Sequence, residues 1–207
     1  MSDKKAHIAV LVSGGGTNLQ ALIDAEKNGV IKSGTISLVI SNKQSAYALT
    51  RAKNAGIATK VITRKEAGSQ EAFEAALIKE LEEGGTDLIV LAGFMSILSE
   101  NFTSHFRNRI INIHPSLIPS FCGKGFYGLK VHEAALEKGV KVTGATVHFV
   151  NEIPDGGKII MQKAVDVLPG DTPETLQKRV MEQAEWKLLP QAAEKVCNDI
   201  LTGNTED

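Results

Sequence analysis

The sequence predicts an α/β fold, with a single doubly wound, mostly parallel, Rossmann-like sheet and helices on both faces. Short apolar runs alternate with segments of helical periodicity, which is typical of a parallel sheet with crossover helices. A glycine-rich turn follows the first apolar run. Near the C-terminus two alternating runs are separated by a turn ending in Asp155-Gly156-Gly157, which indicates a hairpin or a closely spaced strand pair. A chain of 207 residues suits one domain, so we expect residues 1–207 to form it.

The overall charge and the cysteines exclude several classes of protein. The formal net charge is −1 and there is no strong Lys/Arg run, which argues against a nucleic-acid partner. No apolar run is long enough to cross a bilayer, and the N-terminal residues 1–5 lead into a strand without a signal-peptide cleavage site. Cys122 and Cys197 form no CxxC pair, so we expect neither a disulfide framework nor a metal site. A cytoplasmic protein that does not bind membranes fits these features best.

Strand signals are regular along the chain. His7–Val12 is a short apolar run that ends in glycines, which indicates a buried strand feeding a tight turn. Asp87–Ala92 is the most apolar run, and we expect it to be central. The other predicted strands are Thr35–Ser41, Ala58–Ile62, Arg109–His114, Val142–Val150 and Lys158–Val167.

Helices are predicted between these strands. Thr17 and Asn18 are suitable caps for a helix that ends at about Asn28. A helix over Ser69–Glu83 is strongly periodic, with Phe73, Ala76, Leu77 and Leu81 inward. The last helix starts at Thr172, has proline at its first position, and runs to about Asn198 with a possible kink or break at Pro190. Further helices are expected at Ala46–Ala55, before Phe106 and at Leu129–Lys138.

The loop Ser13-Gly14-Gly15-Gly16 has the features of an anion-binding turn. A strand, a glycine-rich loop and a helix N-terminus direct backbone N–H groups at a bound anion. No lysine follows the glycines, so the loop is not a P-loop, and it lacks the full dinucleotide pattern. Asn42 also stands where NAD enzymes place an acidic residue. A single phosphate monoester is the functional interpretation, and a plain tight turn is the alternative.

The stretch from Ile111 to Ser116 carries the strongest catalytic signal. Its alternation puts Asn112 and His114 on one face of a strand, and Pro115 ends the strand. Ligands of open α/β sheets bind at this carboxyl-end rim. An amide donor and a titratable imidazole suit a reaction that builds charge on a carbonyl oxygen. The alternative is a half-buried polar pair that serves the turn.

A third candidate is Asp155, in the glycine-rich turn. If it lies near His114, its charge should raise the pKa of the imidazole and orient the ring. The alternative is an ordinary turn aspartate. Asn112, His114 and Asp155 together would form an acyl-transfer site. The sequence has no GxSxG elbow and no Cys beside a His, so we expect direct transfer. For the other histidines we expect a structural or pocket-lining role (His148) or a surface or helix-face position (His7, His105, His132).

Four segments resemble the folate-dependent formyltransferase family: VSGGGTNLQALID, LAGFMSIL, NIHPSLIPSF, and TGATVHFV followed by DGG. The resemblance runs from about Ile8 to the final helix, and the SGGGTN loop is similar to the glycinamide ribonucleotide branch. It implies transfer of a formyl group from 10-formyltetrahydrofolate to the amine of 5′-phosphoribosylglycinamide in purine (IMP) biosynthesis. It also implies a phosphate-binding half, about residues 7–92, and a folate-binding and catalytic half, about residues 93–201.

The resemblance assigns roles to individual residues. Asn112, His114 and Asp155 would be catalytic, with His114 as the proton donor. The substrate phosphate and ribose would be bound by Gly16, Thr17, Asn18 and Glu185. The folate would be bordered by Phe94, Met95, Ser96, Ile97, Leu98, Asn112, Val150, Asn151 and Asp155.

The chain departs from the family pattern on the folate side. Ser96 and Gln70 stand where the family often has arginine, and Arg64 is the candidate substitute. The loop Phe121–Gly128 is longer than usual, and its glycines and aromatics lead us to expect that it closes over the folate. Lys158 replaces a common proline.

Two other functions compete with this one. A formyltetrahydrofolate hydrolase or a methionyl-tRNA formyltransferase would need a further domain, for which this chain has no room. A binding-only module would not need the three polar residues together. We expect small-molecule partners and a monomer or homodimer.

Overall fold

The computed structural model describes residues 4–204, so the parts of the single-domain and N-terminal predictions that concern residues 1–3 and 205–207 lie outside the described residues. Seven strands form one mixed sheet in the order β3-β2-β1-β4-β5-β6-β7. Strands β1 to β5 pair in parallel, whereas β5–β6 and β6–β7 pair antiparallel. The predicted fold class is confirmed, as are the central position of the Asp87–Ala92 strand and the pairing of the last two strands.

The strands begin and end close to the predicted positions. Alternate residues of β1 face opposite cores: Ile8 and Val10 pack with one cluster, and Ala9 and Leu11 with the other. A strand that is buried on both faces consists almost entirely of apolar residues, and this is the pattern from which the strand was predicted. The strands are β1 (Ala6–Val12), β2 (Gly34–Ser41), β3 (Ala58–Val61), β4 (Leu88–Leu91), β5 (Ile110–His114), β6 (Val142–Phe149) and β7 (Ile159–Asp166).

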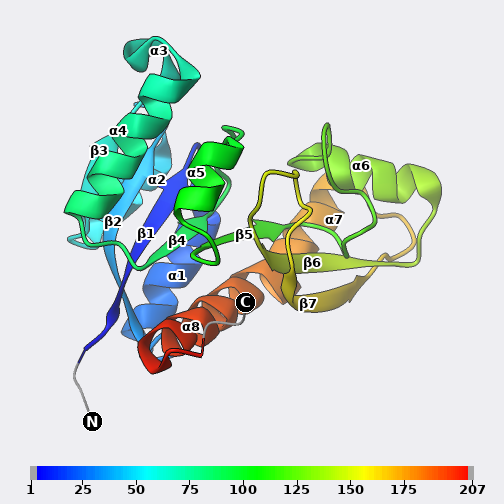
Figure 1. Cartoon of the computed structure of the whole chain (residues 1–207). Coiled ribbons are helices and arrows are strands. Elements are labelled where there is room, and N and C mark those ends of the chain that lie inside the picture. Colours follow the sequence, from blue (N-terminus) through cyan, green and yellow to red (C-terminus); the bar gives the residue numbers. More distant parts are fainter. Residues whose placement is uncertain (1–3, 205–207) are drawn as a thin grey trace.

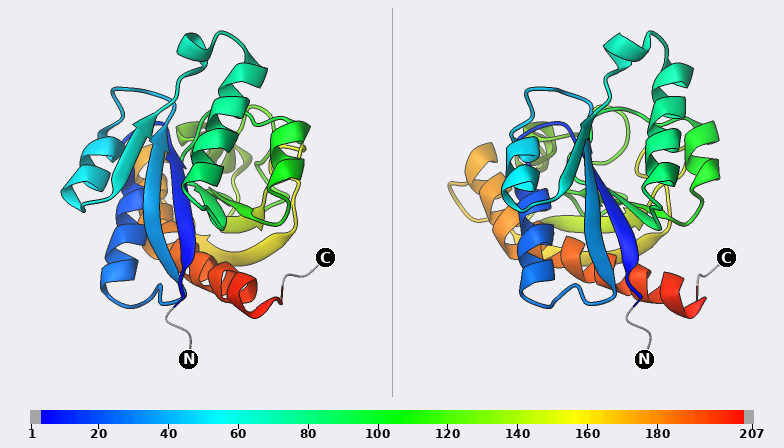
Figure 2. Two further views of the ribbon diagram at one scale, coloured as in Figure 1. Left: turned by 60° about the vertical axis from the view of Figure 1, so that its left-hand side comes forward. Right: turned by 90° about the vertical axis from the view of Figure 1, so that its left-hand side faces the viewer.

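Helices cover both faces of the sheet (Figure 1). One core packs α4 and α5 against the sheet through Phe73, Leu77 and Phe102. The opposite core takes in α1, α2, α6, α7 and α8, and α1 and α8 lie side by side there (Figure 2). The helices are α1 (Thr17–Lys27), α2 (Tyr47–Asn54), α3 (Arg64–Ala67), α4 (Gln70–Glu83), α5 (Glu100–His105), α6 (Leu129–Lys138), α7 (Pro173–Val180) and α8 (Trp186–Thr202).

The helix ends differ from the prediction at two places. Gly16, in a left-handed conformation, is the N-cap of α1, and no side chain caps this helix, so the predicted capping by Thr17 and Asn18 is wrong. The extra turn α3 was not predicted, because four residues leave no periodic signal. In α4 the predicted inward residues are buried, except that Ala76 is only partly so.

The last helix is interrupted, but not at the predicted residue. A π-helical turn, Met181–Glu185, separates α7 from α8, whereas Pro190 lies inside the continuous α8. The predicted start at Thr172 with Pro173 is confirmed, with a capping box to Thr175. Turns of the π type occur frequently at functional sites. In the described part of the chain, no helix is long and apolar enough to cross a membrane.

Candidate functional site

A cleft of about 700 Å³ lies at the carboxyl ends of β4 and β5 and is lined by Asn112, His114 and Asp155 together. Asn18 and Glu185 line the same cleft from the α1 side. A smaller compartment of about 140 Å³ shares Asn112 and Asp155 with it. The fold therefore brings the three predicted catalytic residues to one cavity, beside the helix that follows the glycine loop.

His148 orients the amide of Asn112. Its Nδ1 lies 2.7 Å from the carbonyl oxygen of Phe149, and because a carbonyl only accepts, Nδ1 carries a hydrogen. The other ring nitrogen, Nε2, lies 3.2 Å from Nδ2 of Asn112 and 3.5 Å from Oδ1 of Asp155. An amide nitrogen has two hydrogens, so Asn112 keeps a second donor. His148 is buried and lines the smaller compartment, in agreement with the predicted pocket-lining role.

His114 is 4% exposed at the end of β5, and both of its ring nitrogens face polar groups. Nε2 lies 2.8 Å from the carbonyl oxygen of Phe121 and therefore donates to it. Nδ1 lies 3.5 Å from Oδ2 of Asp155. Nδ1 is thus the nitrogen that gains and loses the proton, and the carboxylate is placed to stabilise the protonated ring.

Asp155 interacts with three groups from different parts of the chain. The first is His114. The second is His148, whose Nε2 lies 3.5 Å from Oδ1 of Asp155, and the third is the N–H of Gly123, which donates a hydrogen bond of 2.8 Å to Oδ2. Asp155 has a left-handed backbone (φ 55°). A Cβ at Gly157 would lie 1.8 Å from the carbonyl oxygen of Phe149, which explains why the turn needs glycine there.

The pKa values of this pair follow from opposing effects. Burial lowers the pKa of His114, and it outweighs the charge of Asp155 and the Phe121 carbonyl, which raise it. The predicted effect of the Asp155 charge is therefore confirmed in sign, but burial is the larger effect and the net shift of the His114 pKa is downward. For Asp155, burial favours the neutral acid, but its interactions with His148, His114 and Gly123 outweigh it and lower the pKa.

Asn18, in the first turn of α1, and Glu185 line the other side of the cleft. Asn18 Nδ2 donates to Oε2 of Glu185 at 2.8 Å, while Asn18 Oδ1 is buried without a partner among the described residues. Glu185 is 6% exposed, and burial raises its pKa. Thr17 does not line this cleft; it borders a separate groove between α1 and α8. Gly16 packs against α2.

The predicted folate-side residues divide between the two compartments. Phe94, Ser96 and Ile97 line both, and Met95 lines the larger one. The smaller compartment also takes in Leu98, Val150 and Asn151. Arg64 is exposed on α3 and does not line either compartment. Gln70 reaches the site indirectly: its Nε2 donates to the carbonyl oxygen of Ile97 at 3.1 Å.

Sequence reasoning missed His132. We expected a surface or helix-face position, but the ring is 1% exposed and lines the larger cavity. Burial and the nearby His114 lower its pKa to about 4. The signal was available, because Val131 and Ala135, on the same helix, are also buried. His7 and His105 are exposed, as predicted.

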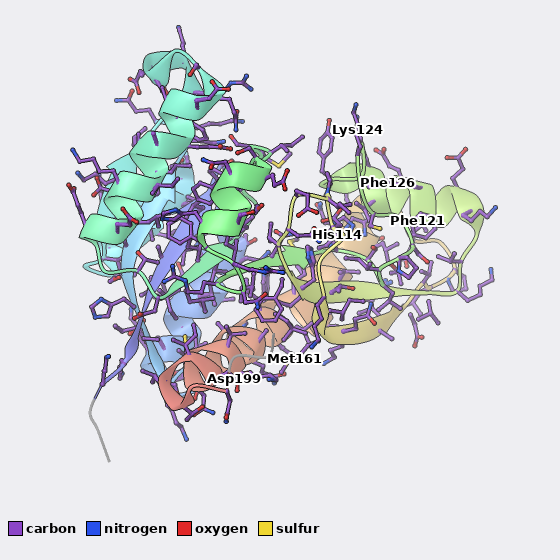
Figure 3. The ribbon with its side chains drawn as sticks, viewed as in Figure 1. His114, Phe121, Lys124, Phe126, Met161 and Asp199 are labelled. Atoms are coloured by element: carbon purple, nitrogen blue, oxygen red, sulfur yellow. The ribbon has the colours of Figure 1, made fainter. Side chains whose placement is uncertain are left out.

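The loop Phe121–Gly128 borders the cleft (Figure 3). Figure 3 shows His114 at the end of β5 and, above it, the loop that carries Phe121, Lys124 and Phe126. The loop is tied to the site at its start, through the Phe121 carbonyl and the Gly123 N–H. Within residues 4–204 no group of three or more His, Cys, Asp or Glu side chains could hold a metal ion.

The chain is similar to known proteins over most of its length. A sequence model of the family described as formyl transferase matches residues 6–193. The phosphoribosylglycinamide formyltransferase of Escherichia coli (strain K12) is 46% identical over 177 residues, which cover 86% of this chain and 81% of that protein. The crystal structure of glycinamide ribonucleotide transformylase 1 from Symbiobacterium toebii has a TM-score of 0.87 and 43% identity, covering 94% of this chain and 88% of that one.

A second group of relatives is much longer. The Bos taurus trifunctional purine biosynthetic protein adenosine-3 is 48% identical over 195 residues, which cover 94% of this chain but 19% of that protein. The chain therefore spans about a fifth of the length of these multifunctional relatives.

Proposed function

Because the chain belongs to the formyl transferase family, we propose that it transfers a formyl group from 10-formyltetrahydrofolate to the amino group of 5′-phosphoribosylglycinamide in purine (IMP) biosynthesis. The observation that supports this most is the meeting of Asn112, His114 and Asp155 in one cleft that Asn18, from the helix after the glycine loop, also lines. A donor amide, a titratable imidazole and a carboxylate are the groups that acyl transfer to an amine needs.

The proposed reaction uses the chain's own side chains throughout. The amine attacks the formyl carbon, and the negative charge that develops on the formyl oxygen is stabilised by Asn112 and His114. One such donor contributes a factor of about 10²–10³ in rate. The attacking amine gives its proton to Nδ1 of His114, and the ring passes that proton to the folate nitrogen as the carbon–nitrogen bond to the folate breaks. Nδ1 is the site of this proton, because Nε2 is engaged by the Phe121 carbonyl.

The smaller compartment fits the formyl donor, which supplies the one-carbon group when bound. Its wall includes the apolar side chains of Phe94, Leu98 and Val150, as a flat ring system requires. Ile97 and Met95 at the mouth are 71% and 51% exposed, so a bound ligand would cover them.

The phosphate and ribose of the other substrate fit the opposite end of the cleft. Asn18 lines that end, and the N-terminus of α1 at Gly16, Thr17 and Asn18 has backbone N–H groups without an intrahelical partner and a positive dipole end for the phosphate. Glu185 and Asn18 would hold ribose hydroxyls, since Asn18 Oδ1 has no partner among the described residues and a hydroxyl can donate to it.

The remaining features belong to the same proposal. The enzyme acts in the cytoplasm as a monomer or homodimer, on small molecules, without a metal. Cys122 and Cys197 are both free thiols, which suits a reducing compartment.

An assay with both substrates tests the function. We expect formyl transfer by the wild-type protein and a loss of about 10²–10⁴-fold in kcat for His114→Ala. His105→Ala, which changes an exposed histidine outside the cleft, is the control and should keep full activity. Formate release that ignores phosphoribosylglycinamide would indicate a hydrolase instead. Binding of both ligands without turnover would indicate a binding module.

A further inference from the structure

Helix α2 holds the glycine loop from behind. The carbonyl oxygen of Gly14 accepts a hydrogen bond of 3.0 Å from the N–H of Ala48. The carbonyl oxygen of Gly15 accepts one of 2.8 Å from Nε of Arg51. Two successive carbonyls of the loop are therefore fixed toward α2, one by backbone and one by a side chain.

Peptide geometry converts this restraint into an orientation for the N–H groups. In a planar trans peptide the C=O and the N–H point in opposite directions. The carbonyl of Gly15 and the N–H of Gly16 belong to the same peptide group. Because the carbonyl points toward Arg51, the N–H of Gly16 points away from Arg51. The same reasoning, applied to the Gly14 carbonyl, turns the N–H of Gly15 away from α2. Both N–H groups then face the side opposite to α2.

The guanidinium of Arg51 is itself held in place. Its Nη1 donates to Oε1 of Gln20 at 3.1 Å, and it lies 5.1 Å from the ring centroid of Tyr47. Its stem also lies close to the loop, because a Cβ at Gly16 would come within 3.5 Å of the Arg51 Cδ. A planar group with this many partners fixes direction better than a lysine ammonium can.

We propose that Arg51 is a positioning residue for the substrate phosphate. It holds the Gly15 carbonyl so that the N–H of Gly16 and the N-terminus of α1 are presented to the phosphate before the substrate arrives. This inference rests on the proposed function, because it assumes that the glycine loop binds the phosphate. Arg51 need not touch the phosphate, so its effect should be confined to ligands that carry one.

Kinetics with and without the phosphate provide the test. For Arg51→Met we expect KM for phosphoribosylglycinamide to rise about 10- to 100-fold, with kcat and the KM for the formyl folate near wild type. The same substrate without its phosphate should be used equally well by both proteins. Lys53→Met, which removes an exposed cation of the same helix, controls for net charge and should leave all constants unchanged.

Arg51→Lys tests whether the planar geometry of the guanidinium matters or only its positive charge. It keeps the cation but loses the planar fork, so we expect it to behave like Arg51→Met. Wild-type KM values in Arg51→Lys would overturn the proposal, and so would an equal loss with the dephosphorylated substrate. Should Arg51→Met fail to fold, Arg51→Lys and Gln20→Leu, which removes the support of the guanidinium, carry the test.

Binding measured without turnover keeps the two proposals distinguishable. The affinity for ribose 5-phosphate, measured by calorimetric titration, does not depend on formyl transfer. We expect weaker binding by about 10- to 100-fold in Arg51→Met, and equal binding would overturn the positioning role. A wild-type protein that binds ribose 5-phosphate in this way but transfers no formyl group would refute the proposed function alone.

Discussion

His114 and Asp155 face each other across the cleft, with Nδ1 of the imidazole 3.5 Å from Oδ2 of the carboxylate. The two residues come from the end of β5 and from the turn before β7, on opposite sides of β6 in the sheet order. The same carboxylate also receives the Gly123 N–H. The carboxylate of Asp155 thus favours the protonated ring of His114 and also anchors the start of the loop Phe121–Gly128.

Removing the charge of Asp155 should shift the pH profile. Burial already lowers the pKa of His114, and the negative charge of Asp155 opposes that shift. In Asp155→Asn the pKa of His114 should fall further, so the pH below which the ring is protonated moves down. We expect kcat to drop by about 10²-fold or more, since general acid–base catalysis contributes that much. Rates from pH 5 to pH 9 check this, with Glu137→Gln, exposed on α6 and outside both compartments, as the control. An unchanged profile would contradict the pairing.

Protonation of His132 should destabilise the fold in acid. Its pKa is lowered from 6.5 to about 4. Because the unfolded chain binds the proton more readily, stability is fully present above about pH 6.5 and is lost as the pH falls toward 4. The difference corresponds to about 3 kcal/mol in the free energy of unfolding. Urea unfolding from pH 7 to pH 4 of the wild type and His132→Gln measures it. Equal pH slopes in the two proteins would refute this prediction.

The turn that places Asp155 should not tolerate a side chain at Gly157. A Cβ there would meet the Phe149 carbonyl oxygen at 1.8 Å, so the backbone must move. We expect Gly157→Ala to lower the free energy of unfolding by about 2–4 kcal/mol. Gly14→Ala is the matched control for stability, since an added Cβ meets nothing within 4 Å. Thermal unfolding of both variants measures this. A loss of stability in Gly157→Ala alone indicates backbone strain, whereas an equal loss in Gly14→Ala would indicate a general cost of replacing glycine.

Glu74 should matter for the formyl donor although it lies outside the cleft. This buried carboxylate accepts from the N–H and the hydroxyl of Ser99 and, at 2.6 Å, from Gln70. It therefore fixes the end of the loop that carries Ile97. In Glu74→Ala the partly buried N–H of Ser99 loses its acceptor, at a cost of about 1 kcal/mol. We expect a higher KM for the folate with the phosphoribosylglycinamide KM kept. Glu71→Ala, exposed on the same helix, should match wild type.

The loop Phe121–Gly128 should become protected when a folate analogue binds. Its tip at Lys124 and Gly125 is exposed, whereas its start is tied to His114 and Asp155. A ligand in the cleft would add contacts to the tip and slow its cleavage. Limited proteolysis with trypsin, which can cut at Lys124, measures this. Cleavage at the same rate with and without the analogue would count against closure.

The sequence by itself determined the sheet, because strands buried on both faces must be apolar runs and glycines must punctuate them. It also identified Asn112 and His114 as neighbours on one strand face, since alternation is a local property. The turn at Asp155 was also predicted from the sequence, because two glycines follow this residue.

Only the tertiary structure decided which side chains meet and how deeply they are buried. The contact of His114 with Asp155 depends on β6 pairing antiparallel with β5, which no local pattern encodes. Burial outweighs the effect of the Asp155 charge on the pKa of His114, and the fold places His132, which we expected at the surface or on a helix face, in the lining of the cleft. Desolvation is a property of the packed molecule and is set by atoms far away in sequence, so a pattern of residues along the chain cannot supply it.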